Sequence, residues 1–306
     1  MHEWPLMVFT LMAQASIGGL LLTLLLCVPR FASWTEPQRD EILRLPLLAF
    51  FAVGAIGVLA SILHLGNPWH MFYTITHVST SWMSREIVSV CVYMGLLGLC
   101  VACVCLEWSL VAKRFAVLAK LVRWKRALFR PLLLVTGLVG FGTVFVMSEC
   151  YTDKIFVMWS RPLVYASYWG ATLLVGGALA CATLLITLRK YDKDQTSVGR
   201  MIQTAFFAGC AGLLLFAASV LALPPRMDAP VTNAITPRQV NFDTLFQLGL
   251  LRGALLAAGL FVIYRMVRRP PAAALTLRPL LAAIVIFAGE FIGRYVFFSL
   301  GLSAVH

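Results

Sequence analysis

Residues 44–66 read RLPLLAFFAVGAIGVLASILHLG, a run that carries one formal charge, on Arg44, and ends beside His64. A helix needs ~20 mostly apolar residues to cross ~30 Å of hydrocarbon, so this run is long enough to span a membrane. Polar residues follow it, and the next apolar run begins at Glu86. Continuous rather than alternating apolar character predicts a helix, because lipid offers the backbone no hydrogen-bond partner.

The same pattern recurs along the whole chain of 306 residues, of which 60% are hydrophobic and 12% charged. A soluble protein has about 25% charged residues, so the composition predicts a membrane protein. The fold expected is all-α and polytopic, a single integral-membrane domain over 1–306 with eight transmembrane helices. The spans expected are 5–29, 44–66, 86–107, 128–148, 166–188, 198–223, 242–267 and 275–301.

The basic residues set the expected orientation. Eighteen Lys and Arg residues fall in or beside the first, third, fifth and seventh loops, and five fall on the other side. Because cytoplasmic loops carry the excess of positive charge, both termini and the even-numbered loops are expected in the periplasm. Clustering in short loops also argues against a nucleic-acid-binding face. No Lys or Arg precedes Arg30, so the N-terminus lacks the basic segment of a secretory signal and is expected to be retained.

Ionisable residues inside the apolar runs are expensive in lipid and are by default candidates for a functional site. With the expected orientation, Glu86, Arg252, Glu290 and Arg294 all lie in the external half, and Gln14 lies at similar depth. Each has a structural alternative. The i,i+4 spacing allows Glu290 and Arg294 to neutralise each other, Arg252 can extend toward the interface, and Glu86 can stabilise a helix N-terminus.

Small residues predict where helices approach closely. The pairs are Gly18-Gly19, Gly176-Gly177, and Gly289 with Gly293 in a G-x-x-x-G pattern. Such residues allow helix backbones to come into contact in membranes.

His64 at the end of one run and Glu86 at the start of the next suggest proton handling for a lipid-soluble substrate, a quinol. A histidine can accept a hydroxyl proton near neutral pH, and a carboxylate can pass it to water. No haem is expected, because His64 alone among the five histidines is placed at depth. Cys100, Cys103 and Cys105 are expected to be buried thiols rather than cluster ligands, since a cluster needs four thiolates. Electrons would therefore pass to a partner.

Four motifs together resemble the DmsC-type membrane anchor subunit of dimethyl sulfoxide reductase. They are His2-Glu3-Trp4-Pro5-Leu6, Ser61-Ile-Leu-His64-Leu-Gly66-x-Pro68, Ser84-Arg-Glu86-Ile87 and Ala288-Gly-Glu290-x-Ile-Gly-Arg294. The resemblance implies an eight-helix anchor without haem in the bacterial inner membrane, which oxidises menaquinol near the periplasmic face. It also implies two periplasmic partners, a four-cluster iron–sulfur subunit and a molybdopterin catalytic subunit.

The resemblance also implies roles for individual residues. His64 and Glu86 correspond to the quinol-site histidine and acid, Gly66 belongs to the same segment, and Glu290 and Arg294 form the polar pair of the last helix. His70 stands where the family pattern leads us to expect arginine.

Other functions remain open from the sequence. The chain resembles, in its eight-helix organisation, anchors of polysulfide or nitrite reductase type. A proton-coupled transporter would use Arg252, Glu290 and Arg294 as substrate or proton sites. A purely structural tether would need none of these residues for electron transfer.

Overall fold

The apolar runs form helices in the computed structural model, which describes residues 4–28, 33–63, 76–105, 119–152, 160–188, 190, 196–221, 242–268 and 277–302. The helices within these ranges are α1 (Trp4–Cys27), α2 (Glu36–Ile62), α4 (Trp82–Cys105), α6 (Ala119–Cys150), α7 (Arg161–Leu188), α8 (Thr196–Leu221), α9 (Phe242–Arg268) and α10 (Leu277–Leu302). All eight are long and apolar enough to cross a membrane. The described residues therefore confirm the predicted all-α architecture with eight helices able to cross a membrane, while the placement of the termini remains a prediction.

Several helices begin earlier than the apolar runs. The helix α2 starts at Glu36 rather than at 44, because the backbone N–H of Thr35 donates to the Gln38 side chain at 3.1 Å and a proline occupies the first turn. The helix α7 starts at Arg161 rather than at 166. Such polar first turns extend the helices beyond what hydropathy alone detects.

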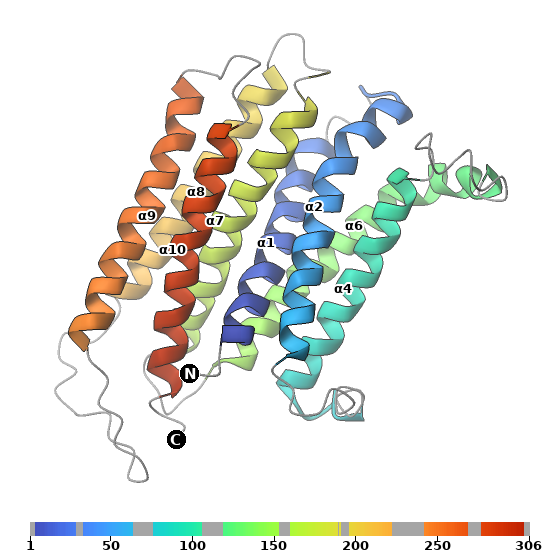
Figure 1. Ribbon diagram of the computed structural model, residues 1–306. Coiled ribbons are helices and arrows are strands. Elements are labelled where there is room, and N and C mark those ends of the chain that lie inside the picture. The colour runs from blue at the N-terminus through green and yellow to red at the C-terminus, as the bar shows by residue number, and fades with distance from the viewer. Residues whose placement is uncertain are drawn as a thin grey trace.

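The two most buried helices, α1 and α7, pack against each other in the middle of the bundle. In Figure 1, α2, α4 and α6 lie on one side of this central pair and α8, α9 and α10 on the other. The start of α1, the start of α4 and the end of α10 lie at the same end of the bundle (Figure 1), which we call the terminal end.

Glycines bring the two central helices into backbone contact. A Cβ atom on Gly176 would lie 2.7 Å from the backbone nitrogen of Gly19 and nearer still to the Cα of Gly18. A Cβ on Gly18 would in turn meet the backbone carbonyl of Thr172. The predicted close packing of these small residues is confirmed, and it fixes the distance between α1 and α7 beside the polar residues described next.

Candidate functional site

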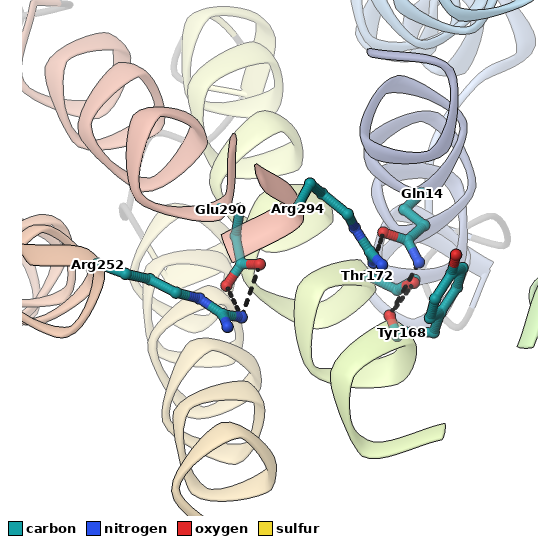
Figure 2. Close-up of polar contacts among 6 residues, drawn as sticks. All are labelled: Gln14, Tyr168, Thr172, Arg252, Glu290 and Arg294. Carbon is teal, nitrogen blue, oxygen red and sulfur yellow. Dashed lines mark hydrogen bonds and ion pairs between the residues drawn. The ribbon is translucent and has the colours of Figure 1, made fainter. Parts of the chain in front are cut away.

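Arg252 and Glu290 form a buried ion pair between α9 and α10. The Nη2 of Arg252 donates to both carboxylate oxygens of Glu290, at 3.1 and 3.0 Å (Figure 2). The guanidinium also lies over the ring of Phe216 in α8, with its Cζ 4.0 Å from the ring centroid. Gly293 makes room for it, because a Cβ there would stand 2.5 Å from Nε. Glu290 thus pairs across the helices and not with Arg294 on its own helix.

Arg294 is 1% exposed and reaches from α10 to the central helices. Its Nη2 donates to Gln14 Oε1 at 2.6 Å, and its Cζ lies 4.0 Å from the centroid of the Tyr168 ring. Gln14 is itself held, because its Nε2 donates to the backbone carbonyl of Tyr168 at 3.3 Å, a carbonyl that also accepts from the Thr172 hydroxyl (Figure 2). The Nε and Nη1 of Arg294 are buried and have no hydrogen-bond partner among the described residues.

Glu86 approaches the same place from α4. It is 3% exposed, and its Oε1 is buried with no hydrogen-bond partner in the described part of the chain. The Cys150 thiol is its side-chain hydrogen-bond neighbour, and Arg294 is close enough to interact with it electrostatically. Glu86 and Arg294 are therefore oppositely charged neighbours that each keep polar atoms unused.

Two tyrosines complete the cluster. The Tyr168 hydroxyl is buried and has no hydrogen-bond partner among the residues that the structure describes. Tyr168 interacts electrostatically with Arg294, Glu86 and Cys150. Its ring stacks on Tyr151, with ring centroids 5.7 Å apart. Burial, together with the nearby Glu86, raises the pKa of Tyr151 well above its ordinary value, so this phenol stays neutral.

We call Gln14, Glu86, Cys150, Tyr151, Tyr168 and Arg294 the polar cluster. It lies toward the terminal end of the bundle, since Glu86 is in the second turn of α4 and Cys150 ends α6. Unpaired buried polar atoms are rare in native proteins and call for an explanation. Here they come from three helices and comprise a carboxylate acceptor, guanidinium donors and a phenolic donor. A ligand with a hydroxyl group fits this set, because it can donate to Glu86 and accept from Arg294.

Some of the predicted site residues are among the described residues, and others are not. Glu86, Glu290 and Arg294 lie in the terminal half, with Glu290 one helical turn from Arg294, and the assignment of this half to the external side remains a prediction. His64, Gly66 and His70 lie outside the described residues.

Sequence reasoning missed Tyr168, Tyr151 and Cys150. Aromatic residues near span ends are typical of the lipid interface, and this pattern concealed their inward positions. The structure starts α7 at Arg161, before the expected span, and this places Tyr168 two turns inside the helix.

Two further buried polar groups lie outside the cluster. Glu149 accepts hydrogen bonds from the Tyr165 hydroxyl at 2.6 Å and from Arg161 Nη2 at 3.1 Å. Arg39 and Asp40, at the opposite end of the bundle, form a buried pair with 3.4 Å between Nη2 and Oδ1. This pair precedes the expected span 44–66, so the expectation about ionisable residues within the spans did not include it.

Thiol and metal chemistry has little support in the described residues. Within them, no group of three or more His, Cys, Asp or Glu side chains is placed to hold a metal ion. Cys100 is buried as predicted, with its thiol 3.4 Å from the Thr136 hydroxyl, whereas the prediction was wrong for Cys103 and Cys105, which are only partly buried. The described cysteines form no disulfide bonds.

Comparison with known proteins gives a match over nearly the whole sequence. The sequence model of the DMSO reductase anchor subunit (DmsC) family matches residues 1–300. The protein is 27% identical over 305 residues to anaerobic dimethyl sulfoxide reductase chain YnfH of Escherichia coli (strain K12), covering 99% of this chain and 96% of that protein. It is 28% identical over 316 residues to the C subunit of anaerobic dimethyl sulfoxide reductase of the same strain, with the same coverage of 99% and 96%. The C subunit of the corresponding reductase of Haemophilus influenzae (strain ATCC 51907 / DSM 11121 / KW20 / Rd) is 28% identical over 186 residues, 61% of this chain and 60% of that protein.

Proposed function

Because the chain belongs to the family of DMSO reductase anchor subunits, we propose that it oxidises menaquinol in the polar cluster and passes the electrons to an iron–sulfur partner. Membership makes it a membrane anchor within an oxidoreductase complex, a multi-pass protein of the bacterial inner membrane. The family implies iron–sulfur and molybdenum-containing catalytic partners. We propose in addition that the iron–sulfur subunit holds four clusters, and that both partners stand on the periplasmic side.

One observation carries the proposal: Glu86 and Arg294 are buried, interact electrostatically, and each keep polar atoms without a hydrogen-bond partner among the described residues. Quinol oxidation breaks two O–H bonds and releases two protons and two electrons. The Glu86 carboxylate is the acceptor for one of these protons, and the Arg294 guanidinium stabilises the oxygen that loses it. An apolar pocket with a few placed polar groups suits an aromatic ring.

The remaining site residues enter the proposal on sequence alone. His64 is proposed as the second proton acceptor, with Gly66 and His70 in the same quinol-binding segment. Glu290 supports the site through its ion pair with Arg252, which holds α10 against α9. The chain is proposed to hold no haem, so each electron goes directly to the partner's nearest cluster.

Loop charge supports a periplasmic site. The polar cluster lies at the terminal end of the bundle, and the excess of Lys and Arg falls in the loops at the opposite end. The family match favours this function over an anchor of polysulfide or nitrite reductase type and over a transporter, which the sequence had left open.

The test is the reduction of the partner's iron–sulfur clusters in membranes by the reduced form of a short-chain menaquinone, followed by electron paramagnetic resonance. Glu86→Gln keeps the shape of the side chain and removes its basicity, so the rate of cluster reduction is expected to fall by roughly 10²–10⁴-fold. His64→Arg is expected to abolish the reaction as well. Reduction with dithionite reports whether the complex has assembled.

Glu149→Gln is the matched control. Glu149 is also a buried carboxylate at the terminal end, but Tyr165 and Arg161 occupy its oxygens. This variant is expected to retain the quinol-dependent rate. A Glu86→Gln complex that assembles and reduces its clusters at the wild-type rate would refute the proposed site.

A further inference from the structure

The Tyr168 hydroxyl is a buried donor of the polar cluster that has no partner among the described residues and no part in the proposed function so far. Two other tyrosine hydroxyls in this protein have hydrogen-bond partners. Tyr93 lies 3.0 Å from the Ser16 hydroxyl, and Tyr165 donates to Glu149 at 2.6 Å. A buried hydroxyl without a partner has lost its hydrogen bonds to water without replacement, so the position of Tyr168 calls for a compensating role.

The place of Tyr168 points to that role. Its ring lies under the guanidinium of Arg294, with the Cζ 4.0 Å from the ring centroid. Its hydroxyl and the Nε and Nη1 of Arg294 are all buried donors left unused by the described residues. The same tyrosine interacts electrostatically with Glu86, whose Oε1 is an unused acceptor. Donors and acceptor from α4, α7 and α10 thus meet in one cluster.

We propose that Tyr168 is a catalytic residue of the quinol site, whose hydroxyl, with the free N–H groups of Arg294, donates to the quinol oxygen that becomes a quinone carbonyl. This inference rests on the proposed function and extends it. The Tyr168 ring has a second task, since it holds the Arg294 guanidinium in place beneath that oxygen.

The chemistry balances with the groups present. The quinol hydroxyl at this position loses its proton to the Glu86 carboxylate, and the second hydroxyl loses its proton to the second acceptor of the proposed function. The two electrons leave one at a time for the iron–sulfur cluster of the partner. The first oxygen changes from a donor and acceptor to a pure acceptor, and negative charge develops on it as its proton leaves. Fixed donors aimed at that oxygen therefore bind it more tightly as the reaction proceeds.

The test separates the hydroxyl from the ring. Tyr168→Phe keeps the ring beneath Arg294 and removes only the hydroxyl. In the full complex, oxidation of the reduced short-chain menaquinone is expected to show a kcat about tenfold lower, the worth of one hydrogen bond, with KM little changed.

The dependence of the rate on pH gives an independent readout. Removing a donor from the developing oxyanion makes the quinol less acidic. The midpoint of the increase in rate with pH is therefore expected to shift to a higher pH by about one unit. The groups that face Tyr168 in the described residues are Arg294, Glu86, Cys150 and Tyr151, and the variant leaves all of them in place.

Tyr93→Phe is the matched control, because it removes a buried hydroxyl that already has a partner. The two variants are expected to give opposite results. Tyr93→Phe lowers the stability of the complex and keeps kcat and the pH profile, whereas Tyr168→Phe keeps the stability and changes both.

The outcomes distinguish this inference from the proposed function. If Glu86→Gln stops quinol oxidation while Tyr168→Phe matches wild type in kcat and pH profile, Tyr168 is structural and the inference is wrong. If the Glu86→Gln complex keeps the full rate, the proposed function itself fails. A drop in kcat for Tyr168→Phe that comes with an unchanged pH profile also counts against a donor to the quinol oxygen.

Discussion

Replacing Gly176 with alanine tests how the helix packing builds the site. A Cβ at this position would lie 2.7 Å from the backbone nitrogen of Gly19 and even closer to Gly18. Carbon and nitrogen atoms normally stay ~3.5 Å apart, so α1 and α7 must separate by about 1 Å. Overpacking of this kind costs about 1–3 kcal/mol, while alanine returns up to ~1 kcal/mol of helix propensity.

Gly177→Ala provides the comparison. A Cβ there would meet its neighbours at ordinary distances, with 3.4 Å to Leu22 Cδ1 and 3.5 Å to the carbonyl of Ala205. This variant gains the same helix propensity without the clash. The free energies of unfolding in mixed micelles are therefore expected to differ by about 1–3 kcal/mol, with Gly176→Ala the less stable.

The separation of α1 and α7 in Gly176→Ala is also expected to disturb the polar cluster. Gln14 lies one turn before Gly18 on α1, and its bond to Arg294 measures 2.6 Å. A shift of about 1 Å stretches this distance beyond hydrogen-bonding range. Quinol-dependent cluster reduction is thus expected to fall in Gly176→Ala at equal amounts of assembled complex and to stay at the wild-type level in Gly177→Ala. Identical stability and identical rates in the two variants would refute the close contact of α1 and α7.

Three other perturbations have expected outcomes. Glu290→Leu leaves the Arg252 charge buried and unpaired, so it is expected to lower the free energy of unfolding by about 3–5 kcal/mol. Adding Arg252→Met is expected to restore most of this loss. A double variant no more stable than Glu290→Leu alone contradicts this. Gln14→Leu removes the partner of Arg294 and is expected to slow quinol oxidation roughly tenfold without loss of complex, and a wild-type rate argues against the positioning role. Alkaline phosphatase fused to the C-terminus is expected to be active if that end is periplasmic, and an inactive but stable fusion contradicts the orientation.

The fold was predictable because hydropathy reports directly on the membrane environment. Runs such as 44–66 leave no alternative to a helix when every backbone group must be satisfied internally. The helix starts were harder to predict. The first turn of α2 is polar, and its extension depends on the bond between Thr35 and Gln38, which is a matter of local capping and not of hydropathy.

The site was predictable in its depth but not in its pairings. Counting residues along each span was enough to place Glu86, Glu290 and Arg294 in one half, because the rise per residue of a helix is constant. Counting does not give the rotation of one helix against its neighbour. The partner of Glu290 is therefore Arg252 on α9, although Arg294 has the favourable spacing on its own helix. Tyr168 was missed because an aromatic residue near a span end is typical of the lipid interface, and counting residues does not show that its helix turns it inward.

The pairing of Glu290 with Arg252, and not with Arg294, matters for the reaction. If Glu290 were bound to Arg294, the carboxylate would use part of the guanidinium's N–H donors and neutralise its charge, so less of either would remain for a substrate. Pairing Glu290 with Arg252 instead leaves Arg294 held by the neutral Gln14, so the guanidinium keeps its charge and two unused nitrogens. With Glu86 ionised, the two acids and two arginines sum to zero charge. Transfer of a proton from the quinol to Glu86 leaves these four side chains with a net charge of +1 and puts a negative charge on the quinol oxygen, so the total charge of the site stays zero. Arg294 is the counterion before and after the transfer, which is why its position matters more than the strength of any single bond to it.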